Sequence, residues 1–358
     1  MTKFGRHEQP GVGFRPVLLV LAAALALTLI TTVEAAPPEY DVTLHMDLAY
    51  GPAVPGNLLD LYLPDVPGNA DLPLIIWNSG SAFFSNTAKD SAGAIAIAEE
   101  FTARGYAVAT ISVRSSFDAR FPALGYDVRA AVRWLRENAA EYGIDPTRFA
   151  FMGNSSGGWA AAFAATTSDI LELPGEEGVD GTSSAVQVAV PFFPPTDFLS
   201  MDAFAEANGL PNTSFAYPHD SPTSPEGFLI ACPGETFPTD LFSIQDCPVE
   251  TEEADPSSYI EGEEVPIWVL HGLADILLPY NQSLLVYEAT TAEGNEARFT
   301  LVPNGGHDVY SIIDAEAATT WITNRGGKEK VVQGPGPSWD DIEHFLHVNL
   351  SRARGNGR

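Results

Sequence analysis

The sequence predicts an α/β fold, with a mostly parallel β-sheet covered by helices on both faces. Runs of apolar and β-branched residues, such as Leu72–Trp77 and Ala107–Val113, alternate with longer segments of helical periodicity. The first of these runs is continuously apolar and the second is rich in β-branched residues, as expected of strands that are buried on both faces. A chain of 358 residues with 45% hydrophobic content can build this layered core as a single domain.

The elements follow one another in a regular order. Two early strands, Asp41–Tyr50 and Leu59–Leu63, are predicted as an antiparallel pair joined by the loop Gly51–Asn57. The clearest helix is Asp127–Gly143, in which apolar side chains recur at spacings of three and four and the final glycine ends the helix. The other predicted strands are Phe149–Met152, Val186–Phe192, Pro266–Leu270 and Phe299–Val302, and the other predicted helices are Thr87–Arg104, Trp159–Thr166, Asn281–Thr291 and Asp340–Leu350.

The N-terminus has the layout of a signal peptide. Basic residues precede an apolar run of 14 residues, Val17–Ile30, and the sequence VEAA, which ends in two small alanines, follows it at 33–36. We therefore expect residues 1–35 to be cleaved from a domain of residues 36–358 that is secreted or periplasmic. An uncleaved membrane anchor is the alternative, but the run is shorter than the roughly 20 apolar residues that span a bilayer.

The composition is strongly acidic. The chain carries 18 Lys and Arg residues against 47 Asp and Glu residues, and loss of three basic and two acidic residues with the signal peptide leaves 15 − 45 = −30. Such a charge favours solubility and repels nucleic acid and anionic membranes, so neither is an expected partner. A solvated acidic surface is the simplest interpretation, and a cationic substrate is the alternative.

Both cysteines, Cys232 and Cys247, fall in a segment of different composition. Between about residues 200 and 254 the chain is rich in Pro, Ser, Thr and acidic residues. We interpret it as an insertion over the carboxyl edge of the sheet, closed by a disulfide worth on the order of 3 kcal/mol. Because ligands bind at this edge, the insertion is a candidate lid or recognition element, and a loop merely held by its disulfide is the alternative.

The strongest chemical signal is the sequence GNSSG at residues 153–157, which fits G-x-S-x-G between a predicted strand and a predicted helix. This context is typical of the α/β-hydrolase fold, in which a nucleophilic serine occupies a sharp turn that only small neighbours allow. Ser155 is the predicted nucleophile, because only it has glycine two residues before and two residues after it. The backbone N–H of Ser156 is a predicted donor to the oxyanion.

A serine hydroxyl needs a base, and in this fold the partners follow in the order serine, acid, histidine. His307 is the predicted base, because it lies in a glycine-rich turn directly after the last predicted strand. Asp275, in the loop after the strand Pro266–Leu270, is the predicted acid that orients the imidazole. Asp197, one strand earlier, is the competing acid.

Other residues of the same types fit these roles less well. In this fold the histidine follows the acid, but His271 precedes every plausible acid in the later part of the chain. This order favours a role for His271 in supporting its loop. His344 and His347 lie on the closing helix, as packing or surface residues do. Asp308 adjoins the base and is better suited to solvating or capping the turn.

A second oxyanion donor is expected from the loop after Leu72–Trp77, whose small residues permit close backbone approach. The N–H of Ser81 is the predicted donor, with Gly80 or Ala82 beside it. An ordinary turn of small residues is the alternative. No metal or organic cofactor is implied.

Several longer segments resemble one known family. They are the helix DVRAAVRWLRENAAEYGIDPTR before GNSSGG, the motif FFPPTDFL, the stretch ADPSSYI before VPIWVLHGLADILLPYNQS, and VPNGGHD. Together they resemble the acetylxylan and feruloyl esterase-like α/β-hydrolases, which are related to the hormone-sensitive-lipase-like carboxylesterases. The resemblance implies a triad of Ser155, Asp275 and His307. The family's usual His-Gly-Gly-Gly loop is replaced by SGSAF at residues 79–83.

These features together predict acyl transfer through an acyl-enzyme. The expected substrates are short-chain or aryl carboxylic esters, either small molecules or acetyl and feruloyl groups linked to polysaccharide. A serine peptidase of the same fold is one alternative. A non-catalytic binding protein built on the same scaffold is the other.

Overall fold

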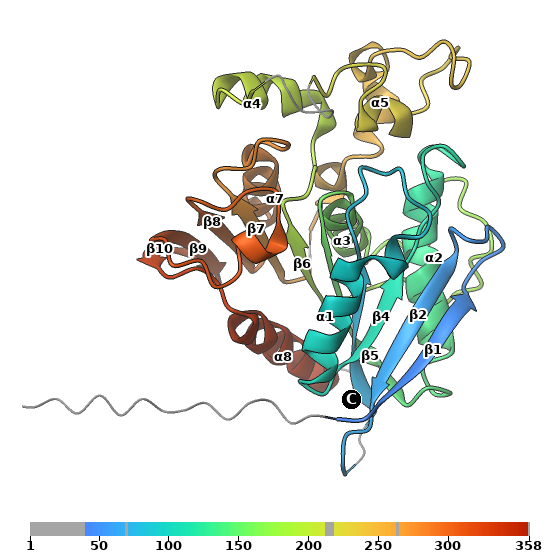
Figure 1. Ribbon diagram of the computed structural model, residues 1–358, viewed down its shortest axis with the longest axis vertical. Helices are drawn as coiled ribbons and strands as arrows, with labels where there is room; N and C mark the ends of the chain where they lie inside the picture. The colour runs from blue at the N-terminus through green and yellow to red at the C-terminus, as the bar shows by residue number, and fades with distance from the viewer. Residues whose placement is uncertain (1–39, 69–70, 212–217, 263–264, 357–358) are drawn as a thin grey trace, which may run out of the picture. The chain divides into compact units, whose positions relative to one another are not determined.

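The apolar runs of the sequence gather into one mixed β-sheet in the computed structural model, which describes residues 40–68, 71–211, 218–262 and 265–356 (Figure 1). Within these residues the strand order is β1-β2-β4-β3-β5-β6-β7-β8-β9-β10. The strands are β1 (Val42–Ala49), β2 (Leu58–Pro64), β3 (Leu72–Asn78), β4 (Ala107–Ile111), β5 (Ile144–Asn154), β6 (Val188–Phe192), β7 (Ile267–Gly272), β8 (Ala297–Val302), β9 (Thr319–Arg325) and β10 (Lys328–Gly334).

The sheet is parallel at its centre and antiparallel at both edges. Strands β4, β3, β5, β6, β7 and β8 pair in parallel. At one edge β1 pairs with β2 and β2 with β4 in antiparallel fashion, and at the other edge the pairs β8–β9 and β9–β10 are also antiparallel. The predicted α/β fold with a mostly parallel sheet is therefore confirmed.

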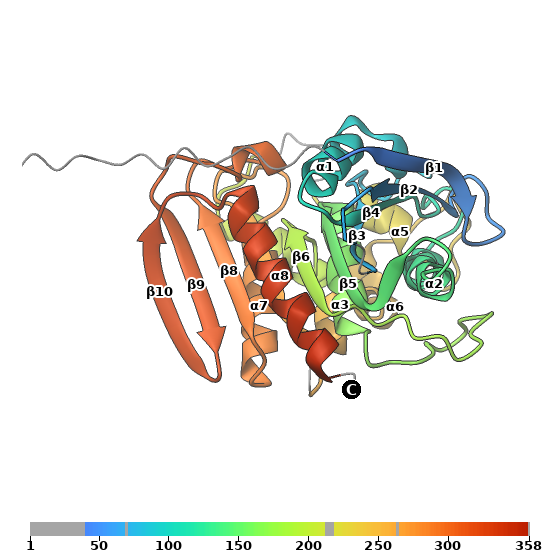
Figure 2. The ribbon, with the colours of Figure 1, turned by 90° about the horizontal axis from the view of Figure 1, so that it is seen from below.

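Helices cover both faces of this sheet. They are α1 (Ala92–Thr102), α2 (Ala123–Glu137), α3 (Ser156–Thr166), α4 (Met201–Ala207), α5 (Pro225–Leu229), α6 (Pro248–Glu252), α7 (Asn281–Ala292) and α8 (Trp339–Asn356). Alternate residues of β3 face opposite layers: Leu74 and Ile76 pack in the cluster that contains α2 and α3. Ile75 and Trp77 pack in the cluster that contains α1 and α8, and Figure 2 shows α8 lying along the central strands. Two buried faces explain why the central strands are continuously apolar.

The helix predicted over Asp127–Gly143 begins four residues earlier in the structure, at Ala123, and it also ends earlier, at Glu137. Helix α2 begins after Pro122, whose ring is tolerated at a helix start, and it ends at Glu137. The side-chain amide of Asn138 then donates to the carbonyl of Trp134, which satisfies a terminal acceptor. Turns follow, and Gly143, with φ of +65°, leads into β5 instead of ending the helix.

The hairpin of β9 and β10 is an element that the sequence patterns did not predict. Strand β10 is an exposed edge strand in which Lys, Glu and Gln accompany Val331 and Val332, so it has no long apolar run. The available signal was the pair Gly326 and Gly327, both with positive φ, in the two-residue turn between the strands. Such a turn favours Gly-Gly because both of its central residues need positive φ.

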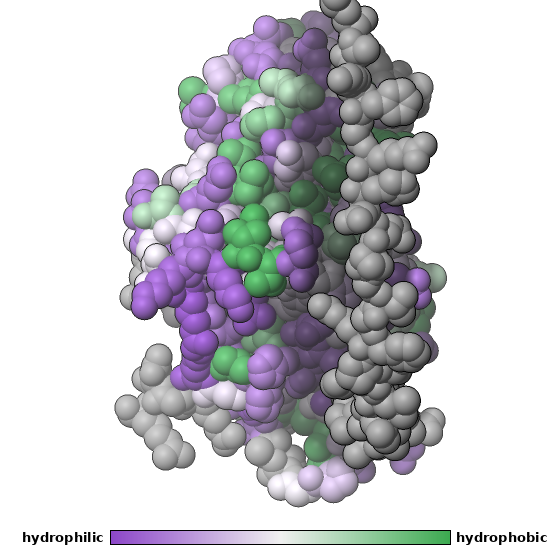
Figure 3. Space-filling model, turned by 90° about the vertical axis from the view of Figure 1, so that its left-hand side faces the viewer, coloured by the Kyte–Doolittle hydropathy of each residue, from purple (hydrophilic) through white to green (hydrophobic). Residues whose placement is uncertain are grey.

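The segment predicted as an insertion, about residues 200–254, lies between β6 and β7, and its described residues include the short helices α4, α5 and α6. Cys232 and Cys247 form a disulfide within it, with a Cα–Cα distance of 5.4 Å. On the face shown in Figure 3, the coloured residues form hydrophilic areas with smaller hydrophobic patches between them.

The described residues belong to a single compact unit, Pro37–Arg358. No helix among them is long and apolar enough to cross a membrane. The predicted signal peptide, residues 1–35, lies outside the described residues.

Candidate active site

Ser155 occupies the sharp turn between β5 and α3. Its backbone has φ of 56° and ψ of −125°, a conformation that non-glycine residues rarely adopt and that marks functional turns. Its N–H donates to the carbonyl of Phe192 on β6 at 3.0 Å, which anchors the turn to the sheet. A Cβ on Gly157 would lie 1.9 Å from the carbonyl oxygen of Asn78, and one on Gly153 would lie 2.3 Å from that of Gly157. The two glycines are therefore required by close packing.

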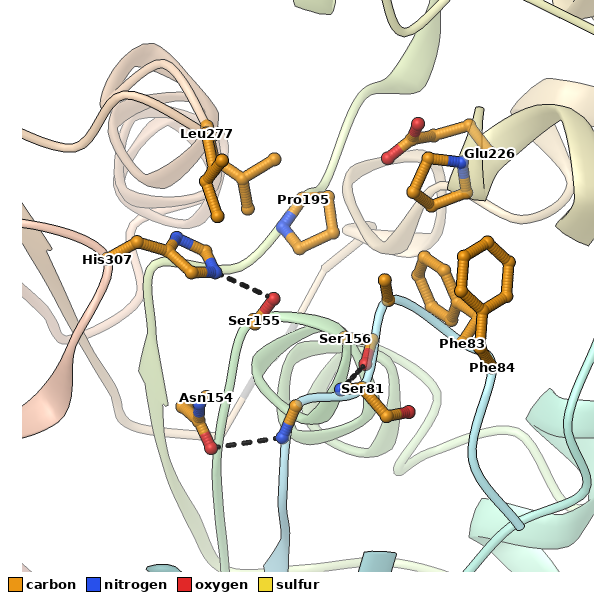
Figure 4. A pocket seen from close by; sticks show the side chains of 14 residues that line it. Ser81, Phe83, Phe84, Asn154, Ser155, Ser156, Pro195, Glu226, Leu277 and His307 are labelled. Carbon is orange, nitrogen blue, oxygen red and sulfur yellow. Dashed lines mark hydrogen bonds between the residues drawn. The ribbon is translucent and has the colours of Figure 1, made fainter. Parts of the chain in front are cut away.

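Three predicted residues from distant parts of the chain form one hydrogen-bonded chain. His307, in the loop after β8, places Nε2 2.9 Å from the Oγ of Ser155. Its Nδ1 lies 2.7 Å from Oδ2 of Asp275, in the loop after β7. Figure 4 shows the imidazole of His307 turned toward Ser155. This arrangement allows Nε2 to accept the serine proton while the carboxylate holds the other ring nitrogen.

Asp275 is buried, with 4% of its surface exposed. Its Oδ1 accepts hydrogen bonds from the N–H groups of Leu277 and Leu278, at 2.8 and 3.0 Å. Burial by itself would raise the pKa of this carboxyl, but interactions with His271 and His307 outweigh burial and hold the pKa well below its usual range. The group is thus a stable carboxylate.

His271 is the second imidazole beside this carboxylate. Its Nε2 lies 3.4 Å from Oδ2 of Asp275 and 3.2 Å from the carbonyl oxygen of Leu278, and its Nδ1 lies 2.7 Å from the hydroxyl of Ser283. These contacts tie the acid's loop to β7 and α7. They agree with the supporting role that its position in the sequence indicates.

The other acids and histidines considered for the triad make different contacts. Asp197 accepts a hydrogen bond from the N–H of Ser200 and caps a short helical turn. Asp308 accepts one from the N–H of Tyr310 in the same way. His344 and His347 are exposed on α8. Among the contacts of the described residues, none joins these four side chains to Ser155 or His307.

Two of the four predicted oxyanion donors already donate hydrogen bonds to side chains in the structure. The N–H of Ser81 donates to the hydroxyl of Ser156 at 2.8 Å, and the N–H of Gly80 donates to Oδ1 of Asn154 at 3.1 Å (Figure 4). Both N–H groups therefore already donate hydrogen bonds to side chains of the turn that carries the nucleophile. Among the described residues, no side chain accepts a hydrogen bond from the N–H of Ala82 or of Ser156, which leaves these two groups as the candidate pair.

A cavity of about 300 Å³ opens beside Ser155 and His307. Its wall is mostly apolar and includes Phe83, Phe84, Pro195, Pro225, Leu277 and Leu278. Glu226, from α5 of the insertion, also lines it. Sequence reasoning missed these residues because their segments approach one another only in the folded chain.

The chain matches a family model described as BD-FAE over residues 59–290, a range that contains Ser155 and Asp275. Esterase LipQ of Mycobacterium tuberculosis is 29% identical over 285 residues, which cover 77% of this chain and 61% of that protein. This chain thus spans less than two thirds of LipQ.

Solved structures with the same fold include a truncated form of a carbohydrate esterase from gut microbiota. It has a TM-score of 0.66 and 27% identity, and the match covers 88% of this chain and 99% of that chain. A bifunctional GH43-CE protein of Bacteroides eggerthii has a TM-score of 0.60 and 31% identity, over 74% of this chain and 35% of that one. These matches confirm the α/β-hydrolase fold.

Proposed function

The chain belongs to the BD-FAE family, and from this membership and the geometry of the site we propose that it is a serine hydrolase of carboxylic esters. The membership agrees with the resemblance to acetylxylan and feruloyl esterase-like hydrolases that the sequence motifs indicate. The observation that carries the proposal is the hydrogen-bonded chain from Ser155 through His307 to Asp275 at the wall of a cavity.

The proposed reaction has two halves. Ser155 Oγ attacks the ester carbonyl while Nε2 of His307 takes its proton, and the tetrahedral intermediate collapses when His307 returns that proton to the leaving alcohol. Water then attacks the acyl-enzyme with His307 as the base, which releases the carboxylic acid and restores the serine. The N–H groups of Ser156 and Ala82 would stabilise the oxyanion in both halves.

The ester class follows from the cavity and from the comparisons. A mostly apolar space of about 300 Å³ suits short acyl chains or an aromatic ring. Relatives and neighbours with this fold are named esterases and carbohydrate esterases, so acetyl or feruloyl groups on polysaccharide are included in the proposal. The N-terminal pattern and the disulfide support secretion of the enzyme as part of the same proposal.

The test is hydrolysis by residues 36–358, with Ser155→Ala as the matched inactive variant. The substrates are p-nitrophenyl acetate, butyrate and octanoate, together with methyl ferulate. We expect turnover of the short or aryl esters that disappears in Ser155→Ala, while the thermal unfolding of the two proteins stays similar. Hydrolysis of peptide anilides without hydrolysis of any ester would replace the proposal with a peptidase.

A further inference from the structure

One carboxylate lies in the otherwise mostly apolar wall of the active-site cavity. Glu226 lines this cavity, although only 2% of the residue's surface is exposed. Figure 4 shows its carboxylate beyond Pro195 as seen from Ser155. The group is therefore close to the reaction site and separate from the hydrogen-bonded chain of Ser155, His307 and Asp275.

The two carboxylate oxygens of Glu226 have different surroundings. Oε2 lies 3.3 Å from Nδ1 of His219, a fully buried side chain in the same insertion. Oε1 has no hydrogen-bond donor among the contacts of the described residues. A substrate that fills the cavity would exclude water from this oxygen, and leaving an acceptor without a donor then costs free energy, so a ligand that brings its own donor would gain by supplying it.

The charge of this pair decides which donor fits. Burial by itself would lower the pKa of His219, but the charge and hydrogen bond of Glu226, the charge of Asp202 and a backbone hydrogen bond with Leu277 together outweigh burial and raise it. The imidazole at 3.3 Å from Oε2 offsets the charge of the carboxylate when it is protonated, and the surrounding wall is mostly apolar, so the site favours a neutral donor over a cation. A hydroxyl group has this chemistry.

We propose that Glu226 is a specificity-determining residue whose Oε1 accepts a hydrogen bond from a hydroxyl group of the ester substrate. The inference rests on the proposed esterase function. The hydroxyl has two possible sources: a phenol on the acyl group, or a polyol or sugar on the alcohol group. Polar groups of this kind, placed singly in apolar pockets, usually set orientation and selectivity.

Matched ester pairs separate the two sources. On the acyl side, methyl 4-hydroxycinnamate is compared with methyl cinnamate, and on the alcohol side glycerol monoacetate is compared with propyl acetate. Glu226→Leu is expected to lower the kcat/KM of the hydroxylated ester of one pair, relative to its partner, by about 10- to 100-fold. Glu226→Gln, which is nearly isosteric, is expected to lower the same ratio about threefold because it loses the charge. The matched control is Glu252→Gln, an exposed change on α6 that should leave both ratios as in the wild type.

The ratio is measured within each protein, so a general loss of activity through misfolding does not imitate the expected result. Ratios equal to those of the wild type in folded Glu226→Gln and Glu226→Leu, for both pairs, would overturn the inference while leaving the esterase proposal intact. If Glu226→Leu does not fold, the ratio in Glu226→Gln decides alone. A wild-type protein that hydrolyses none of the four esters would instead count against the proposed function.

Discussion

The Nε2 atom of His307 lies 2.9 Å from the Oγ of Ser155, across a sequence separation of 152 residues. We expect His307→Gln and Ser155→Ala each to lower kcat on p-nitrophenyl acetate by about 10⁴-fold or more. Because the two groups act as a unit, the double variant should be no slower than the slower single variant. Losses that multiply in the double variant would show that the two residues act separately.

The identity of the acid can be tested with two matched variants. Asp275→Asn keeps the shape of the buried side chain but favours the wrong imidazole tautomer of His307, so kcat should fall by about 10⁴-fold. Asp197→Asn, which changes only a helical cap, should stay within about threefold of the wild type. Steady-state kinetics on one ester decide between them. A large loss in Asp197→Asn with little loss in Asp275→Asn would reverse the assignment.

The buried pair of His219 and Glu226 predicts a pH dependence of stability. Because the pKa of His219 is raised in the folded state, its contribution is fully present below the unfolded value of about 6.5 and is lost as pH rises through the folded pKa. Urea denaturation between about pH 6 and 9 should show a fall in unfolding free energy that is smaller in His219→Gln. The same slope in both proteins would place the titrating group elsewhere.

The close packing of the turn around Ser155 can be tested by comparing Gly157, which lies in this turn, with Gly93, which does not. Gly157→Ala would force a Cβ to 1.9 Å from the carbonyl oxygen of Asn78, and should lower the unfolding free energy by more than about 3 kcal/mol. Gly93→Ala, in α1, meets nothing within 4 Å and should raise it by about 0.5 kcal/mol. Chemical denaturation of both variants measures the difference. A stable Gly157→Ala protein would contradict the packing described for the turn.

The disulfide predicts a redox-dependent stability. It joins Cys232 and Cys247, which are 15 positions apart, and both cysteines pack in the core cluster that includes Trp159. Opening this loop in the double Cys→Ala variant should lower the unfolding free energy by about 3 kcal/mol. A reductant should destabilise the wild type and leave the variant unchanged. Equal responses of the two proteins to the reductant would argue against a structural disulfide.

Sequence reasoning succeeded where the determining interactions are local. Continuous apolar runs identified the parallel strands, because burial on both faces constrains every residue of a strand. The sequence GNSSG located the turn of Ser155, because backbone atoms a few ångströms away leave no room for a side chain at either of its two glycines. Chain order singled out Asp275 and His307, whose positions after successive strands bring them to the same edge of the sheet.

What the sequence by itself determined about this protein is therefore the α/β architecture and the three residues that meet at the sheet's carboxyl edge. Only the tertiary structure decided that the N–H of Ser81 donates a hydrogen bond to the hydroxyl of Ser156, 75 residues away. It also decided that Glu226, from the insertion, forms part of the cavity wall. Local periodicity carries no information about either contact. Each depends on how separate loops approach one another in the folded chain, and that approach is set by packing across the whole domain.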